Sequence, residues 1–296
     1  MRRACVDIGT NTTRLLVADR VPGGLRTVAV ARAFVPLGAG TLASRAVADT
    51  RAALVAAVTA HLATAREHGA RSIRVVGTAA LRTDGDADGL CAALREAAGA
   101  DVEILPPREE ARLAFLGATG TLAAPPLHGG DVAVVDVGGG STEIAIGAVG
   151  GAVGWWTSIA TGSAVLTNAH VHSDPPAAAE LAALAAAAEA AVGGVAPPRP
   201  VVAYAVGGSA ASLPRIVGPR VTAQAAERAV ALLTAAPAEQ IAAEHGLDVR
   251  RVRMLPAGIL LLAAVGQALG RDPVVARGGL REGVVLDDRS HQVTEA

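Results

Sequence analysis

The sequence contains no lysine, few aromatic side chains and only two cysteines. All 26 basic residues are therefore arginine, and aromatic residues make up 2% of the chain. Cys5 and Cys91 are too few for a disulfide framework and lack the spacing of metal ligands. We interpret them as reduced thiols in a cytosolic protein. A formal net charge of −1 excludes a global attraction to nucleic acid or to an anionic membrane, so a polyanionic substrate would need a local group of arginines.

The chain also lacks an apolar segment of the kind that targets or anchors a protein. Its first residues reach Asp7 before an apolar run of signal-peptide length has formed. The apolar segment 254–270 is shorter than the roughly 20 residues of a spanning helix and contains Pro256 and Gln267. These features predict a cytoplasmic protein and a buried helix at 254–270.

Two similar stretches, "VDIGTNTTRLLVA" at 6–18 and "VDVGGGSTEIAIG" at 135–147, dominate the remaining pattern. Each reads as a strand that ends in an aspartate, a turn of small residues and a second strand. A chain of 296 residues is longer than a domain with a single hydrophobic core usually is, and 51% of its residues are hydrophobic. We therefore expect a duplicated α/β unit, with ligands bound in a crevice at the carboxyl ends of strands or between domains.

The apolar periodicity outlines the elements around these hairpins. The first hairpin continues into a third strand, which predicts a meander. Strands are expected at 3–8, 102–105 and 201–208, and the segment 72–82 is expected to be a strand that runs into a loop or a helix start. Helices are expected at 48–69, 86–98, 108–120, 176–192, 222–235 and 256–269.

The composition of the two turns indicates phosphate binding. Glycine adopts positive φ at no steric cost, so a turn rich in Gly, Ser and Thr can direct several backbone N–H groups to one point. Asp7 and Asp136 would repel phosphate but can hold a cation that binds it, because Mg²⁺ takes one or two carboxylates with waters and phosphate oxygens. A single hairpin of this kind is commonly a structural turn. Two copies favour the two sides of a cleft that closes on a chain of phosphates.

Six motifs together carry a resemblance to a known family. The motifs are "VDIGTNTTRLLV", "VVGTAALR", "EEARLAFLG", "VVDVGGGSTEI", "AVGGSAASL" and "GGLREGVV". Their order resembles that of the exopolyphosphatase and guanosine pentaphosphate phosphatase (Ppx/GppA) family, in its short two-domain form. The hairpins alone would indicate only the wider superfold of actin, sugar kinases and chaperone ATPases.

The resemblance implies an α/β fold of two ribonuclease-H-like, actin-like domains with an interdomain cleft. We expect an N-terminal domain at 1–122 and a second domain at 123–296, with a helix at about 281–296 that packs back on the first. It also implies Mg²⁺-dependent (alternatively Mn²⁺-dependent) release of terminal phosphate from inorganic polyphosphate. The alternative substrate is pppGpp, which would place the protein in the stringent response. Family precedent favours a homodimer with no nucleic-acid or membrane partner.

The resemblance assigns roles to individual residues. Glu110 matches the catalytic glutamate that orients or deprotonates the attacking water; without the motif it would be an ordinary acidic residue in a first helical turn. Glu109 receives only a structural role. The expected metal ligands are Asp136, Asp7 and Glu143. The expected phosphate-binding residues are Thr10, Asn11, Thr12, Arg82, Gly138, Gly139, Gly140, Ser141, Gly207, Gly208 and Ser209, of which the last three form a third glycine turn. For Arg82 a surface salt bridge is the alternative.

The sequence departs from the family pattern at three places. Pro106 and Pro107 stand where the family often has Ser-Gly before the catalytic glutamate, and two prolines stiffen this loop. Val165 replaces a frequent arginine, and Arg253 replaces a usual aspartate. The two prolines keep open the hypothesis of a non-catalytic relative that binds polyphosphate. The wider superfold keeps open a further hypothesis, an actin-like ATP-binding module.

Overall fold

The computed structural model describes residues 1–37, 44–83, 85–123 and 129–288. The chain divides into two compact units. One comprises Met1–Ala123 with the segment that starts at Gly278, and the other comprises Ala124–Arg277. The helix expected over about 281–296 corresponds to a helix that ends at Leu286, and residues 289–296 lie outside the described part.

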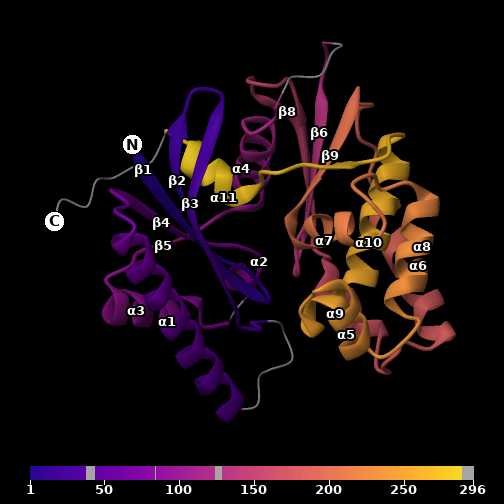
Figure 1. Cartoon of the computed structure of the whole chain (residues 1–296), viewed down its shortest axis with the longest axis horizontal. Coiled ribbons are helices and arrows are strands. Elements are labelled where there is room, and N and C mark those ends of the chain that lie inside the picture. Colours follow the sequence, from indigo (N-terminus) through magenta and orange to yellow (C-terminus); the bar gives the residue numbers. More distant parts are fainter. Residues whose placement is uncertain (38–43, 84, 124–128, 289–296) are drawn as a thin grey trace. The chain divides into compact units, whose positions relative to one another are not determined.

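The first unit contains a mixed sheet in the order β3-β2-β1-β4-β5 (Figure 1). The β1–β2 and β2–β3 pairs are antiparallel, which confirms the predicted meander, whereas β1–β4 and β4–β5 are parallel. Its strands are β1 (Arg2–Ile8), β2 (Thr12–Val21), β3 (Gly24–Phe34), β4 (Ser72–Gly77) and β5 (Val102–Ile104). Its helices are α1 (Ser44–Glu67), α2 (Ala79–Arg82), α3 (Ala87–Ala98), α4 (Pro107–Thr119) and α11 (Leu280–Leu286).

Alternation along β1 directs its side chains to two different cores. Val6 and Ile8 pack with buried residues of α1 and α3. Cys5 points to the opposite face, where its cluster includes Leu113 of α4 and residues of α11. Asp7 follows Cys5 by two positions, and side chains two apart share a face of a strand. Asp7 therefore points to the side of the sheet that α4 and α11 cover.

The second unit repeats this arrangement with the order β10-β9-β6-β7-β8 (Figure 1). Its strands are β6 (Val132–Val137), β7 (Thr142–Gly147), β8 (Val153–Ile159), β9 (Val202–Val206) and β10 (Val274–Val275). Its helices are α5 (Ser163–His170), α6 (Ala178–Val192), α7 (Gly207–Ser212), the 3₁₀ turn η1 (Leu213–Arg215), α8 (Ala223–Leu233), α9 (Ala238–His245) and α10 (Val249–Leu269). In both units the first strand pairs antiparallel with the next strand and parallel with a later strand, which follows one helix in the first unit and two in the second. The predicted duplication is confirmed.

The core of the second unit lies on one face of this sheet. Val135, Val137 and Ile144 pack there with residues of α6, α8 and α10. Asp136 and Glu143 alternate with these residues along β6 and β7, so they point to the other face. Because side chains alternate along a strand, the two candidate carboxylates lie on the face of the sheet opposite the core formed with these helices.

The long helix α10 corrects one sequence expectation. It begins at Val249 rather than at Pro256, after Asp248 accepts a hydrogen bond from the N–H of Arg250 at 2.9 Å. A proline inside a helix costs about 3 kcal/mol or more. Burial of each flanking leucine or isoleucine contributes about 1.5–3 kcal/mol, so packing of the helix outweighs the proline. By length and composition α10 could cross a membrane, but 72% of its apolar window is buried, as in a core helix.

Two shorter segments also differ from expectation. Gly207, Gly208 and Ser209 do not form an open turn: they begin the short helix α7, with Gly207 at a φ of +86°. The sequence analysis did not identify α9, although its C-terminal Gly246 adopts the left-handed conformation that commonly ends helices.

Candidate functional site

In the first unit, the segments that follow three of the strands lie at the same edge of the sheet. The N–H of Thr78 donates to the carbonyl of Ile8 at 3.2 Å, and the N–H of Leu105 donates to the carbonyl of Gly77 at 2.9 Å. Since β1, β4 and β5 are parallel, these bonds tie together the segments that leave their carboxyl ends. The tied segments carry the predicted residues at 10–12, Arg82 and Glu110.

The turns of the two hairpins have the same backbone hydrogen bond. The N–H of Gly9 donates to the carbonyl of Thr12 at 3.1 Å, and that of Gly138 donates to Ser141 at 3.0 Å. Within the described part of the chain, the N–H groups of the two residues after each glycine make no hydrogen bond. These residues are Thr10 and Asn11 in the first turn, and Gly139 and Gly140 in the second. Consecutive free N–H groups of this kind form anion-binding concavities.

Neighbouring segments fix the carbonyl groups of both turns. In the first unit, Thr10 and Asn11 accept hydrogen bonds from the N–H groups of Leu37 and Val35, at 2.7 and 3.1 Å. In the second unit, the carbonyl groups of Gly138 and Gly139 accept from the start of α5, at 2.9 and 3.0 Å. A Cβ on Gly162 would overlap Gly139, so only glycine allows this close approach. A carbonyl shares its peptide plane with the N–H of the next residue, so these bonds hold in place the planes that carry the free N–H groups of Asn11, Gly139 and Gly140.

Asp7 presents a buried oxygen that lacks a hydrogen bond. Its Oδ1 atom is shielded from solvent and has no partner within the described residues. Burial raises the pKa of Asp7, whereas the positive charges of Arg14 and Arg281 oppose this rise and Glu282 adds to it. An unsatisfied buried carboxylate oxygen is costly unless a cation or another donor meets it. Asp7 therefore fits the predicted role of metal ligand.

Glu110 lies in the first turn of α4 and is only 6% exposed. Arg82 donates from Nη1 to Glu110 Oε2 at 2.6 Å and to the carbonyl of Leu105 at 2.7 Å. Arg82 thus forms a salt bridge, but not the surface one considered as the alternative: the two side chains are only 18% and 8% exposed, and the pair holds the predicted catalytic carboxylate. Binding of phosphate by Arg82 stays a prediction. Glu109 pairs with Arg112 at 2.8 Å, as its structural role requires.

The two prolines before Glu110 suit the start of the helix. Pro107 occupies the first helical position, where its missing N–H would lack a helical partner in any case. The carbonyl of Pro106 accepts from the N–H groups of Glu109 and Glu110, at 2.9 and 3.0 Å. The prolines therefore place the carboxylate on a defined first turn, even though they remove the freedom of the usual glycine.

Asp136 and Glu143 are direct cross-strand partners on β6 and β7. Directly opposite side chains lie about 4.5–5.5 Å apart at Cβ, which suits two carboxylates that share one cation. A Cβ on Gly207 would overlap Asp136 Oδ1, so this glycine leaves room for the carboxylate. The described residues contain no cluster of three or more His, Cys, Asp or Glu side chains that could hold a metal. Mg²⁺ requires only one or two carboxylates, so the pair still fits it.

Ser158 is a site residue that the sequence analysis missed. It is the cross-strand partner of Glu143 on β8, and its Oγ donates to Glu143 Oε1 at 2.8 Å. Glu143 is 2% exposed, so this hydrogen bond serves a buried carboxylate. No local sequence pattern marks Ser158, because its pairing with Glu143 depends on the register of β7 and β8.

Ser158→Ala is expected to lower the free energy of unfolding by about 1.5–3 kcal/mol, because the hydrogen bond serves a charged group. Urea unfolding monitored by circular dichroism measures this difference. Ser158→Thr keeps the hydroxyl group and serves as the matched control. An alanine variant as stable as the original chain would show that this bond contributes little.

Ser209 occupies a different environment from the hairpin turns. It is 1% exposed, and a Cβ on Gly258 of α10 would overlap its Oγ atom. Its hydroxyl group therefore lies against α10 in the interior of the second unit. The predicted phosphate-binding role of Gly207, Gly208 and Ser209 stays a prediction.

The model of the Ppx/GppA phosphatase family matches residues 16–292. The chain belongs to the Ppx/GppA phosphatase family. Exopolyphosphatase 2 of Mycobacterium tuberculosis is 36% identical over 189 residues, which cover 59% of this chain and 56% of that protein. The guanosine-5'-triphosphate,3'-diphosphate pyrophosphatase of Aeromonas hydrophila is 28% identical over 297 residues, which cover 95% of this chain and 58% of that protein. The chain thus spans little more than half the length of these relatives.

A solved structure of the family supports the fold. The crystal structure of the Aquifex aeolicus member of the Ppx/GppA family is 24% identical, covers 96% of both chains and has a TM-score of 0.77. The expected α/β class with two actin-like domains is therefore confirmed. The interdomain cleft stays a prediction.

The two departures from the Ppx/GppA pattern in the second unit have defined places. Val165, where the family often has arginine, donates its N–H to the carbonyl of Gly139 at 3.2 Å, and the residue is 43% exposed. An arginine side chain at position 165 would therefore begin beside the second hairpin turn. Arg253 forms an ion pair with Asp174 at 2.9 Å.

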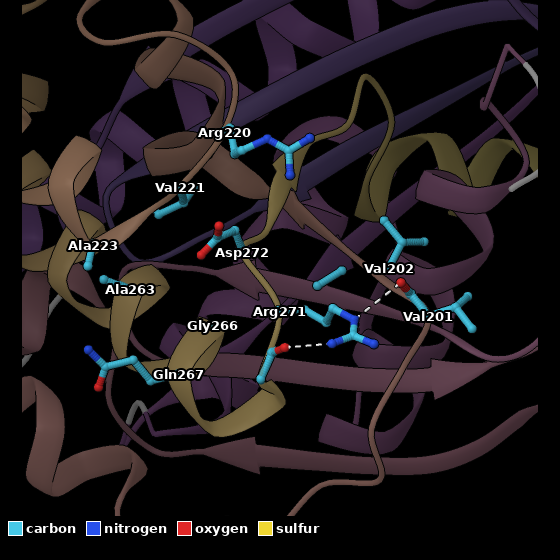
Figure 2. Close-up of a pocket in the computed structure, with 12 residues that line it drawn as sticks. Val201, Val202, Arg220, Val221, Ala223, Ala263, Gly266, Gln267, Arg271 and Asp272 are labelled. Carbon is cyan, nitrogen blue, oxygen red and sulfur yellow. Dashed lines mark hydrogen bonds between the residues drawn. The ribbon is translucent and has the colours of Figure 1, made fainter.

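A cavity of about 420 Å³ lies elsewhere in the second unit (Figure 2). Its lining includes Val202 and Ala203 at the start of β9, Gln267 near the end of α10, and Arg271, which donates to the carbonyl groups of Val201 and Gly270. The predicted glycine turn follows the opposite end of β9. None of the predicted site residues lines this cavity.

Proposed function

We propose that this chain is a Mg²⁺-dependent hydrolase that removes terminal phosphates from inorganic polyphosphate. The observation that carries the proposal is the matched pair of hairpins, each with free N–H groups beside an aspartate. Such N–H groups bind the anionic oxygens of phosphate. Membership of the Ppx/GppA phosphatase family supports the reaction class, and the names of two relatives supply the two candidate substrates.

Glu110 would act on the attacking water. In this reaction the water oxygen bonds to the terminal phosphorus, the bond from phosphorus to the bridging oxygen breaks, and the shortened chain leaves in line with the attack. The water proton passes to the Glu110 carboxylate, and general-base help is typically worth about 10²–10⁴-fold. Arg82 orients this carboxylate, because its guanidinium is also fixed by the carbonyl of Leu105.

The remaining residues would bind the phosphates and the cation. In the second unit Asp136 and Glu143 would hold Mg²⁺ or Mn²⁺, which when bound neutralises charge on phosphate oxygens. In the first unit Asp7 would be a ligand for such a cation. The free N–H groups at 10–11 and 139–140 would bind phosphate oxygens directly. The same proposal includes the following phosphate-binding residues: Thr12, Arg82, Gly138, Ser141, Gly207, Gly208 and Ser209.

The second candidate substrate is pppGpp, whose terminal phosphoanhydride requires the same chemistry. A relative that is named for a guanosine substrate matches 95% of this chain, and this match supports pppGpp as the alternative substrate. An actin-like ATP-binding module and a non-catalytic polyphosphate binder are the further alternatives. Homodimer formation and a cytoplasmic location belong to the same proposal.

Orthophosphate release should be measured in parallel from short polyphosphate, long polyphosphate, pppGpp and ATP, with Mg²⁺ and with EDTA. We expect release from polyphosphate that requires Mg²⁺. Faster release from pppGpp would favour the alternative substrate, and turnover of ATP alone would favour the ATP-binding module. Polyphosphate binding without release from any substrate would contradict the proposed hydrolase.

A further inference from the structure

The helix α4, which carries Glu110, contacts α11 backbone to backbone. A Cβ built on Gly117 would lie closer than 3.0 Å to the carbonyl oxygen of Gly279, and one built on Gly283 would lie equally close to that of Leu113. Real Cβ atoms essentially never approach other atoms within 3.0 Å. The two helices can therefore reach this separation only because both positions lack a side chain.

Glycine at these two positions lowers the stability of the helices that contain it. Gly117 and Gly283 lie inside α4 and α11, where alanine is a much better helix former than glycine. Leu280, Val284 and Val285 of α11 nevertheless pack in one buried cluster with Leu113 of α4. Close packing of the two helices stabilises the first unit, and this stabilisation offsets the low helix propensity of the two glycines.

An ion pair joins the same two elements at the other end of the contact. Asp287, directly after α11, is 4% exposed and accepts from Arg112 of α4 at 3.0 Å. Arg112 also donates to Glu109 at 2.8 Å. The neighbour of Glu110 is therefore connected through one guanidinium to the residue that ends α11.

Glu110 has a second attachment, which lies outside both α4 and α11. Its carboxylate accepts from Arg82, which lies at the end of α2 and is itself bonded to the carbonyl of Leu105. A change in the separation of α4 and α11 would shift Glu110 against this fixed guanidinium. The depth at which α4 sits on α11 thus sets the position of the carboxylate.

We propose that Gly117 and Gly283 are positioning residues for Glu110, and that α11 acts as the template on which its helix is placed. This inference rests on the proposed role of Glu110 in phosphate release. A side chain at either position would push the helices apart and displace the carboxylate without removing a group that contacts the substrate.

The test is Gly283→Ala in the full chain, measured by steady-state phosphate release from polyphosphate. We expect kcat to fall by about 10²-fold, the cost of a displacement of roughly 1 Å. KM should stay within about twofold, because the phosphate-binding groups are unchanged. Gly266→Ala is the matched control: its Cβ would lie 2.8 Å from Pro273 Cδ in the second unit, so it perturbs packing away from α4. The control should keep the original kcat.

Hydrogen exchange supplies a readout that does not need activity. Gly283→Ala should speed exchange of the amides of α4, whereas Gly266→Ala should not. If Gly283→Ala does not fold, Asp287→Asn tests the placement of α11 on α4 by weakening the ion pairs of Asp287 with Arg112 of α4 and Arg74 of β4, with a smaller fall in kcat and unchanged KM. An inactive original chain would overturn the proposed function, and the exchange data would still decide whether Gly283 sets the packing of α4 on α11. An active original chain whose variants keep both kcat and α4 protection would overturn this inference.

Discussion

Glu110→Gln is expected to slow phosphate release by about 10²–10⁴-fold while polyphosphate binding is retained. Glutamine has nearly the same shape and can still accept the hydrogen bond from Arg82, but it cannot take a proton from water. The loss should therefore appear in kcat and not in the dissociation constant. Steady-state phosphate release and equilibrium binding of polyphosphate measure the two quantities separately.

Glu109→Gln is the matched control for this variant. Glu109 lies one residue earlier in the same helical turn and pairs with Arg112. A partly exposed pair three residues apart on a helix contributes only about 0.2–0.5 kcal/mol, so activity should remain near the original value. Equal activity of Glu110→Gln and the original chain would remove Glu110 from the reaction.

Asp136→Asn is expected to reduce phosphate release by about 10²-fold and to raise the Mg²⁺ concentration needed for activity. The amide fits the space beside Gly207 but carries no charge for the cation. Binding of a ligand only to the folded state raises the melting temperature. The increase in melting temperature that Mg²⁺ produces should therefore disappear in this variant, and thermal unfolding with and without Mg²⁺ measures it.

Asp131→Asn is the corresponding control, because Asp131 is exposed and directly precedes the same strand. It should keep both the activity and the Mg²⁺-dependent increase in melting temperature. If Asp136→Asn behaves like this control, the metal site proposed at β6 and β7 is wrong.

The sequence predicted the hairpins and their duplication because both are local features. An aspartate, a turn of small residues and an alternating strand determine each hairpin within about a dozen residues. The repeated strand order in the two units follows once the hairpins are recognised. The position of Glu110 in a first helical turn could likewise be predicted from the sequence, since Pro107 marks the start of α4.

Features that depend on distant segments were not predictable in this way. Pro256 is a local signal for a helix start, but the buried residues on both sides of it extend α10 back to Val249. The pairing of Arg82 with Glu110 joins residues that are brought together by the parallel β4–β5 pair. Ser158 became recognisable only from the register of β7 and β8.

The position of α11 has a consequence for how the protein is made. Leu280, Val284 and Val285 complete the cluster around Cys5, Leu16 and Leu113 in the first unit. During translation this cluster stays open until the ribosome has synthesised the whole second unit and released the residues of α11. The segments of the first unit that precede the second unit therefore keep an apolar surface uncovered until a segment synthesised after the whole second unit becomes available.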